Sequence, residues 1–275
     1  MQKQMNREFY KYISLNVLGM LGLSCYILAD TFFISKRLGA DGLTALNLAI
    51  SVYSIINGLG LMLGIGGATR FCYLSGTERG AEGKSGVHAS AAAGITVGLV
   101  LLFLGFTASD AVAKILGAEG VIQEMTGSYL KTILGFAPFF IVNNILIAFV
   151  RNDGSPRLSM AAMLTGSFSN ILLDYVFLFP LNMGIFGAAL ATGFAPVISI
   201  GLLSLHFIRG KNRFTWSFDQ RALGRRVLDI CSLGISAFIN ELSSAVVLIV
   251  FNLLILRLAG NTGVAAYGIV ANLAW

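Results

Sequence analysis

Charged residues are scarce in this sequence. Only 12% of its 275 residues are Asp, Glu, Lys or Arg, whereas about a quarter of an average soluble domain is charged. Hydrophobic residues make up 56% of the chain, which is more apolar surface than a soluble core can absorb. This composition excludes an ordinary soluble domain and indicates a protein embedded in a membrane.

Cysteine and the common catalytic signatures are also sparse. The three cysteines, Cys25, Cys72 and Cys231, are scattered through apolar stretches with no paired spacing, so neither a disulfide framework nor a zinc site is indicated. The patterns Gly-x-Ser-x-Gly and His-Glu-x-x-His, which mark hydrolases and zinc proteases, do not occur. We therefore expect a protein that is not an enzyme and that carries no cofactor.

Apolar runs of membrane-spanning length are what the sequence does contain, and short polar connections separate them. Because the backbone finds no water inside lipid, each run must satisfy its own hydrogen bonds as a helix. The predicted spans are 12–33, 43–71, 87–107, 132–150, 158–179, 184–207 and 228–256, with an eighth that begins near residue 264. The predicted fold class is an all-α polytopic membrane protein.

A short internal repeat divides the chain. The sequence GADGLTAL at residues 39–46 follows the first predicted span, and GNTGVAAY at residues 260–267 follows the seventh, an offset of 221 residues (260 − 39). Many transporters are built from duplicated halves. The repeat therefore predicts two six-helix bundles, of which this chain holds the first bundle, helix 7 and part of helix 8.

Three regions follow from this division. We predict an N-terminal six-helix transmembrane lobe over residues 1–208, a basic cytoplasmic linker loop over 209–226, and the truncated start of a C-terminal lobe over 227–275. The eighth span stops after about a dozen residues, about half of the 20 that a membrane-spanning helix needs. We therefore expect the chain to be part of a longer protein.

The net charge of +6 has a topological explanation. With the N-terminus placed in the cytoplasm, 14 of the 19 Lys and Arg residues fall on the cytoplasmic side, where positive loops are retained. This predicts a multi-pass protein of the cytoplasmic (inner) membrane with a cytoplasmic N-terminus. The basic balance requires no nucleic-acid partner, and the bilayer itself is the expected surrounding.

Apart from Asp229 at the start of the seventh span, the acids inside the predicted spans are Asp30, Asp174 and Glu241. A carboxylate at the middle of a membrane helix costs about 2.5 to 3.5 kcal/mol on insertion scales, so it normally faces the bundle interior and marks a pathway. The alternative is a structural role near a headgroup or beside a neighbouring hydroxyl.

Asp30, Asn170, Asp174 and Thr192 are expected at overlapping depths in the bilayer. Asn170 and Asp174 are four residues apart and therefore share one helix face. Two carboxylates, an amide oxygen and a hydroxyl form a cluster of hard oxygen ligands, which suits a proton or a small cation such as Na⁺. We predict an ion-coupling site at these four residues.

A second group of residues is a candidate substrate pathway. Phe139, Phe140, Asn143 and Asn144 lie on the fourth predicted span, and Glu241 lies on the seventh. Aromatic and amide side chains can line a route for amphipathic molecules. Packing within the bundle is the alternative role for the four residues on the fourth span.

Several segments resemble the multidrug and toxic compound extrusion (MATE) antiporters. These are residues 29–46 (ADTFFISKRLGADGLTAL), 151–156 (RNDGSP), 169–174 (SNILLD) and 187–192 (GAALAT). The resemblance implies an exporter of mostly cationic, amphipathic drugs or metabolites, driven by inward flow of H⁺ or Na⁺ and alternating between two access states. It also implies that Asp30, Asn170, Asp174 and Thr192 form the ion site, and that Glu241 matches a seventh-helix Glu used by some members.

Three other functions are alternatives to the antiporter. A lipid-linked oligosaccharide flippase of the same superfamily would share the fold, but it is expected to carry a cationic groove, and these spans hold almost no Lys or Arg. A channel would need repeated polar rings along a pore. An intramembrane enzyme would need a nucleophile with a base, or metal ligands. The favoured hypothesis is a monomeric exporter of small, drug-like molecules.

Overall fold

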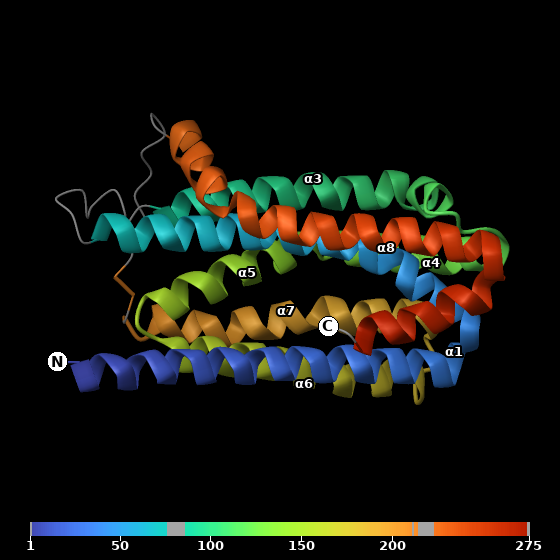
Figure 1. Cartoon of the computed structure of the whole chain (residues 1–275), viewed down its shortest axis with the longest axis horizontal. Helices are drawn as coiled ribbons and strands as arrows, with labels where there is room; N and C mark the ends of the chain where they lie inside the picture. Colours follow the sequence, from blue (N-terminus) through green and yellow to red (C-terminus); the bar gives the residue numbers. More distant parts are fainter. Residues whose placement is uncertain (1, 76–85, 211, 214–222, 274–275) are drawn as a thin grey trace.

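The computed structural model describes residues 2–75, 86–210, 212–213 and 223–273, and every regular element in these ranges is a helix. The helices lie lengthwise beside one another (Figure 1). Their bounds are α1 Gln2–Ser75, α3 Gly86–Ile115, α4 Gly120–Gly135, α5 Ala137–Asn152, α6 Pro156–Leu178, α7 Gly184–Ile208 and α8 Leu223–Leu273.

The two longest helices are each broken at a glycine. In α1 the break is at Gly39 (φ 68°, ψ −153°), and in α8 it is at Gly260 (φ 63°, ψ −161°). Positive φ with such a ψ is a conformation that essentially only glycine adopts. Each break falls between two predicted spans, so α1 contains the first and second spans, and α8 contains the seventh and eighth.

Most of the predicted spans are present with small changes in their bounds. Five described helices are long and apolar enough to cross a membrane, or six if the bent pair α4 and α5 counts as one span. This agrees with a polytopic all-α membrane fold.

The fourth predicted span, 132–150, begins too late. The helix starts at Gly120, and α4 meets α5 at an angle of 50°. Sequence reasoning excluded residues 120–131 because polar side chains interrupt the apolar run, yet α4 buries Ile122, Tyr129 and Leu130 on one face. The bend lies at Phe136, just before Pro138, which has no backbone N–H to continue the hydrogen-bond ladder of α4.

The last four residues of the predicted linker over 209–226 belong to a helix. The helix α8 begins at Leu223, so residues 223–226 are helical. Of the rest of the linker, the structure describes residues 209, 210, 212 and 213, and the other residues lie outside the described ranges.

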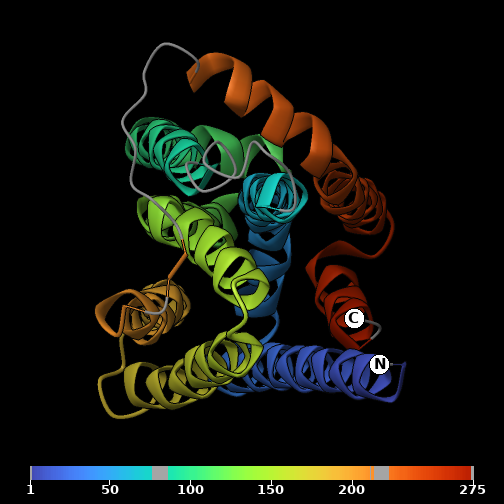
Figure 2. The same ribbon diagram turned by 90° about the vertical axis from the view of Figure 1, so that its left-hand side faces the viewer.

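The second segment of α1 runs through the centre of the molecule, and α8 lies against it along its length (Figure 2). Glycines allow the two backbones to approach closely: a Cβ on Gly66 would collide with the carbonyl oxygen of Ile230, and one on Gly234 would collide with that of Met62. Small residues serve this purpose in membrane bundles. The two helices run antiparallel, and they meet again at Asn47, whose carbonyl oxygen accepts a hydrogen bond from the Asn252 amide (3.2 Å).

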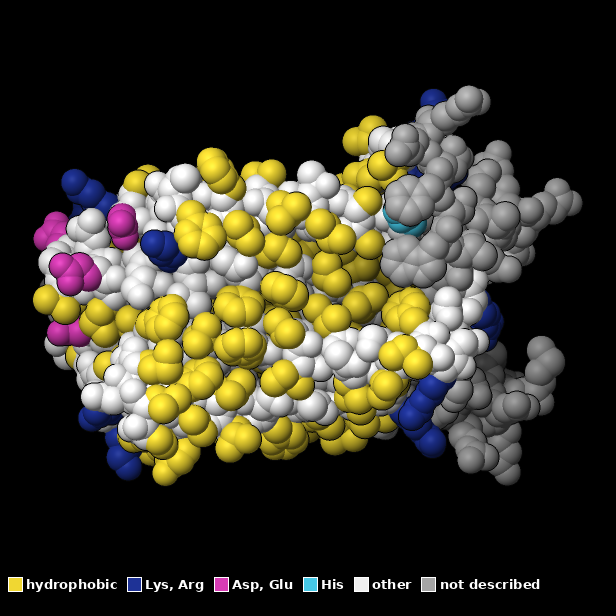
Figure 3. All heavy atoms as spheres, turned by 180° about the vertical axis from the view of Figure 1, so that it is seen from behind, with side chains coloured by type: hydrophobic (Ala, Val, Ile, Leu, Met, Phe, Trp, Pro, Cys, Tyr) yellow, Lys and Arg dark blue, Asp and Glu magenta, His cyan; other side chains and the backbone are white. Residues whose placement is uncertain are grey.

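The surface separates into an apolar middle and charged ends (Figure 3). Large apolar side chains on the outer faces of the helices are exposed, for example Phe103 at 67% and Leu172 at 64%. A soluble protein rarely exposes contiguous apolar patches of this kind. The exposed apolar belt is therefore the surface expected to contact lipid tails.

Candidate functional site

The structure brings the four predicted ion-site residues to the interior of the bundle. Asp30 comes from the first segment of α1, Asn170 and Asp174 from α6, and Thr192 from α7. Asn170 and Asp174 are fully buried, and Asp30 and Thr192 are 6% and 7% exposed. The side chains that sequence reasoning placed at one depth thus lie on three neighbouring helices, and all four are shielded from lipid.

Asn170 is the centre of the hydrogen bonding in this group. In one orientation of its amide, Nδ2 donates to Thr192 Oγ1 at 3.4 Å. In the flipped orientation, Nδ2 donates to Asp174 Oδ2 at 3.1 Å and the amide oxygen accepts from the Thr192 backbone N–H at 3.2 Å. The flipped orientation satisfies both ends of the amide, so it is the better assignment of the two.

The two carboxyl groups lie close enough to interact electrostatically. One oxygen of each, Asp30 Oδ1 and Asp174 Oδ1, is buried and accepts no hydrogen bond from the described residues. A buried carboxylate oxygen without a partner is costly. The arrangement is therefore able to bind a proton or a small cation, either of which would satisfy these oxygens.

Sequence reasoning missed the tyrosines around this cluster. The Tyr129 hydroxyl, on α4, lies near the Thr192 side chain and within electrostatic range of both Asp30 and Asp174. Tyr26 lies near Asp30 and Tyr53. Tyr129 is only 4% exposed. The late start assigned to the fourth span removed Tyr129 from consideration, although a buried tyrosine hydroxyl normally has a polar partner.

The candidate pathway residues on α5 do not share one environment. Phe139 is 42% exposed and Phe140 is buried, with its ring edge-on to Tyr53 at a centroid distance of 5.2 Å. Asn143 has a buried side-chain oxygen that accepts no hydrogen bond from the part of the chain described. Asn144 donates to Asn57 Oδ1 at 2.8 Å. Phe140, Asn143 and Asn144 therefore belong to the bundle, whereas Phe139 reaches its surface.

Glu241 lies where the two halves meet. Its side chain lies near that of Asn57 on α1, and its Cβ packs against Gly58. Asn57, which accepts the hydrogen bond from Asn144, is therefore also a neighbour of Glu241. The Tyr53 hydroxyl is also within electrostatic range of Glu241, so polar side chains extend from the Asp30 cluster through Tyr26 and Tyr53 toward Glu241.

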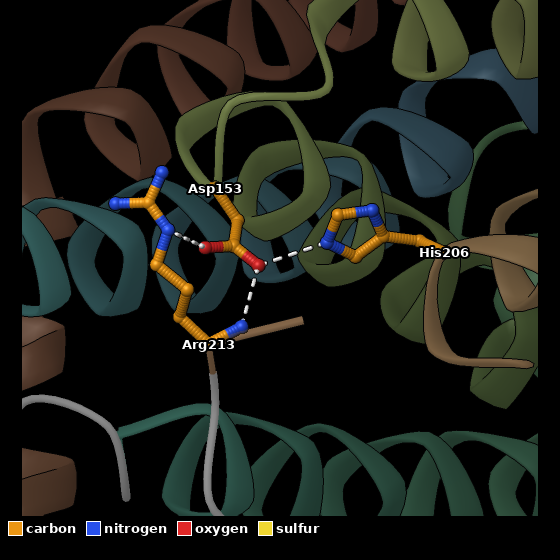
Figure 4. Close-up of polar contacts among 3 residues, drawn as sticks. All are labelled: Asp153, His206 and Arg213. Atoms are coloured by element: carbon orange, nitrogen blue, oxygen red, sulfur yellow. Dashed lines mark hydrogen bonds and ion pairs between the residues drawn. The ribbon is translucent and has the colours of Figure 1, made fainter. Parts of the chain in front are cut away.

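A second buried polar cluster lies at the end of the molecule where α6 begins and α7 ends (Figure 4). Asp153 Oδ2 lies 2.8 Å from His206 Nε2 and accepts a hydrogen bond from the Arg213 backbone N–H at 3.0 Å. Asp153 Oδ1 lies 3.6 Å from Arg213 Nε. Sequence reasoning did not find this cluster, because Asp153 and His206 are more than 50 residues apart and each resembles an ordinary interfacial residue.

The described residues contain no group of three or more His, Cys, Asp or Glu side chains that could hold a metal ion. A cation at the first cluster would therefore rely on two carboxylates together with amide and hydroxyl oxygens. Such oxygen ligands suit a hard, weakly bound cation.

Comparison with known proteins identifies the family. The MatE family model matches residues 17–176. The multidrug export protein MepA of Staphylococcus saprophyticus is 30% identical over 254 residues, which cover 92% of this chain and 56% of MepA. The chain therefore spans a little over half the length of the curated relatives that it matches.

Solved structures agree in fold. The MATE multidrug transporter DinF-BH superposes with a TM-score of 0.87 and 29% identity over 95% of this chain and 59% of that one. A MOP superfamily transporter from Pyrococcus furiosus gives a TM-score of 0.81 and 26% identity over 96% of this chain and 58% of that one.

These matches confirm the predicted fold class and the prediction that the protein is not an enzyme, since the relatives are exporters and transporters. The all-helical architecture, the apolar belt and the two broken helices agree with them. The chain belongs to the MATE family of membrane transporters.

Proposed function

We propose that this chain is the N-terminal part of an exporter that moves small amphipathic, mostly cationic molecules out of the cell in exchange for H⁺ or Na⁺. The observation that carries the proposal is the pair Asp30 and Asp174, which is buried among apolar helices with one unpartnered oxygen on each residue. Buried ionisable residues inside a membrane bundle mark ion or substrate pathways.

Coupling requires that the ion distinguish between conformations. A ligand that binds two states equally shifts neither of them. The cluster meets this requirement because its ligands come from separate helices, α1, α6 and α7. A shift of α1 against α6 and α7 would separate Asp30 from Asp174 and lower the affinity for a shared ion, and binding of the ion would favour the arrangement in which they are close.

The energetics of such an exchange are sufficient. One charge moving inward across about 100 mV releases about 2.3 kcal/mol, and a tenfold ion gradient adds about 1.4 kcal/mol. Together they support a gradient of a few hundredfold for a neutral substrate. A substrate with one positive charge leaves against the same potential, which offsets the 2.3 kcal/mol, so one ion per cation supports a gradient of about tenfold and a second ion would raise this limit.

The substrate route is proposed along the boundary between the halves. The side chains of Glu241 and Asn57 lie near each other there, and Glu241 would supply the negative charge that a cationic substrate needs. Phe139 and Asn143 on α5 are the further candidates for contact. The relatives MepA and DinF-BH are named as multidrug transporters, which supports a substrate class of drug-like molecules.

The membrane orientation belongs to the same proposal. The end of the bundle that carries the start of α6, the end of α7 and the start of α8 holds the basic residues Arg157, Arg209, Arg225 and Arg226. We place this end in the cytoplasm, in accordance with the retention of positive loops on that side. The N-terminus then lies in the cytoplasm, and the exporter acts as a monomer in the cytoplasmic membrane.

The test is transport by the full-length protein that contains this chain, reconstituted in vesicles. Ethidium efflux is measured with an imposed pH gradient, an imposed Na⁺ gradient, and neither. Wild-type protein should move ethidium only with a gradient, and Asp30→Asn or Asp174→Asn should reduce the rate by at least about tenfold, the equivalent of about 1.4 kcal/mol.

Glu119→Gln is the matched control, because Glu119 is an exposed acid beside the first turn of α4 and its loss should leave the rate unchanged. Wild-type rates in both aspartate variants would contradict the ion site. Movement of a fluorescent lipid-linked oligosaccharide in place of ethidium would instead support the flippase alternative.

A further inference from the structure

A cavity of about 230 Å³ lies between the start of α6 and the end of α7. It is separate from the Asp30 cluster and from the boundary between the halves. Its lining residues are Gly154, Ser155, Pro156, Arg157, Leu158, Leu205, His206 and Arg209. In the end-on view, α6 and α7 lie at the edge of the bundle farthest from α8 (Figure 2). A molecule could therefore enter this cavity from the side of the bundle.

The charge around the cavity is positive. Arg157 and Arg209 both line it with exposed side chains. A third guanidinium, that of Arg213, lies beside Gly154, where Nη2 would be 3.6 Å from an added Cβ. Among the described residues, the acid Asp153 directly precedes the lining residue Gly154, and it is buried and already engaged by His206 and Arg213 (Figure 4). Asp153 therefore cancels little of the field from Arg157 and Arg209.

The start of α6 adds to this field. The Ser155 side chain makes no capping hydrogen bond, so the partial positive charge at this helix end is not compensated by its own cap. Pro156 occupies the first turn. The dipole of α6 and the two arginines thus favour the same kind of ligand, an anion.

The depth of the cavity indicates where that anion comes from. Both α6 and α7 are long and apolar enough to span the membrane, and the cavity lies at the ends of both, which is the level of the lipid headgroups. Leu158 and Leu205 give it an apolar wall. Ile208, the last residue of α7 and the one directly before Arg209, is also apolar and is 76% exposed. A ligand with a phosphate group and an attached acyl chain would match the arginines and the apolar wall together.

We propose that this cavity binds the phosphate group of an anionic phospholipid, held between Arg157 and Arg209 with its glycerol and first methylenes against Leu158 and Leu205. Arginine binds phosphate oxygens through two parallel N–H donors, and basic pockets between membrane helices on the cytoplasmic side are suited to lipid headgroups. This proposal does not depend on the transport cycle, because no residue of the Asp30 cluster takes part in it.

The experiment measures bound lipid directly. The purified full-length protein in neutral detergent is titrated with phosphatidylglycerol or phosphatidylcholine, and adducts are counted by native mass spectrometry. Wild-type protein should prefer phosphatidylglycerol. Because each arginine near the surface contributes about 1 kcal/mol to anionic lipid binding, Arg157→Gln with Arg209→Gln should weaken phosphatidylglycerol binding by about thirtyfold.

Arg225→Gln with Arg226→Gln is the matched control. It removes the same charge at the same end of the molecule, but neither residue lines the cavity, so the preference should persist. Arg157→Lys with Arg209→Lys keeps the charge and should recover most of the binding, which separates charge loss from damage to the fold.

Two results would overturn the proposal. One is equal loss of phosphatidylglycerol in the cavity variant and the control variant, which would show a general surface effect. The other is displacement of the lipid by millimolar inorganic phosphate, which would assign the cavity to soluble phosphates instead of the membrane.

Discussion

Gly39 and Gly260 break their helices with nearly the same backbone conformation, φ 68° and ψ −153° in one and φ 63° and ψ −161° in the other. They are 221 residues apart (260 − 39), which is the offset of the short repeat GADGLTAL and GNTGVAAY. The structural match supports a duplicated architecture more strongly than the sequence similarity does, because only a glycine tolerates this conformation at low cost.

Replacing either glycine by alanine should destabilise the protein by about 1–3 kcal/mol, since a Cβ is strained in this backbone conformation even where space is open. Thermal unfolding in detergent measures the effect for Gly39→Ala and Gly260→Ala. Gly201→Ala is the control: Gly201 lies within α7, with no neighbour within 4 Å of an added Cβ, so its substitution should leave the melting temperature unchanged or slightly raised. Equal effects at all three sites would contradict this explanation.

The contact between α1 and α8 should depend on the absence of side chains. Gly66→Ala or Gly234→Ala would place a methyl group against the backbone of the other helix, and overpacking of this kind costs about 1–3 kcal/mol. We expect a lower melting temperature and a larger fraction of protein that aggregates during purification. Gly224→Ala, on α8 but with nothing near its Cβ position, should behave like the wild type.

Tyr129→Phe tests whether the hydroxyl near Thr192 belongs to the ion site. The change keeps the ring packed and removes only the hydroxyl, whose net contribution to stability is at most about 1.5 kcal/mol, so the protein should still fold. We expect a shift in the ion concentration at which ethidium efflux is half-maximal. An unchanged ion dependence, with only a small loss of stability, would limit Tyr129 to packing.

Two substitutions in the Asp153 cluster should lower the free energy of unfolding by very different amounts. Asp153 and His206 are both buried and lie 2.8 Å apart, so Asp153→Ala removes this contact inside the protein and should destabilise it by about 3–5 kcal/mol. The Arg213 side chain is 73% exposed, so Arg213→Gln should cost at most about 1 kcal/mol. Thermal unfolding of the two variants side by side measures this difference, and similar losses in both would contradict it.

The sequence predicted most of the fold because membrane spans depend on local composition. An apolar run of about 20 residues has few alternatives to a helix, and the acids Asp30 and Asp174 are conspicuous within such runs. The fourth span was misplaced because polar residues such as Glu124 and Lys131 interrupt the apolar run, whereas packing against neighbouring helices buries the other face of α4. Composition along the chain does not contain this information.

The contacts that depend on distant residues could not be predicted. The pairing of Asp153 with His206 and the approach of Gly66 to Ile230 each require the arrangement of several helices in space. The approach of Tyr129 to Thr192 depends on the position of α4. In each case, residue type indicated that a partner was needed but did not identify it.

The lengthwise packing of α8 on α1 limits how the two halves can move. The contact extends from Gly66 beside Ile230 at one end to Asn47 beside Asn252 at the other. Separating the two helices would take the acceptors away from the side-chain amides of Asn252 and Asn47, which donate to the Asn47 and Val264 carbonyl oxygens, in a medium that cannot replace them. The α1–α8 contact therefore allows the two helices to roll or slide along each other more readily than to separate.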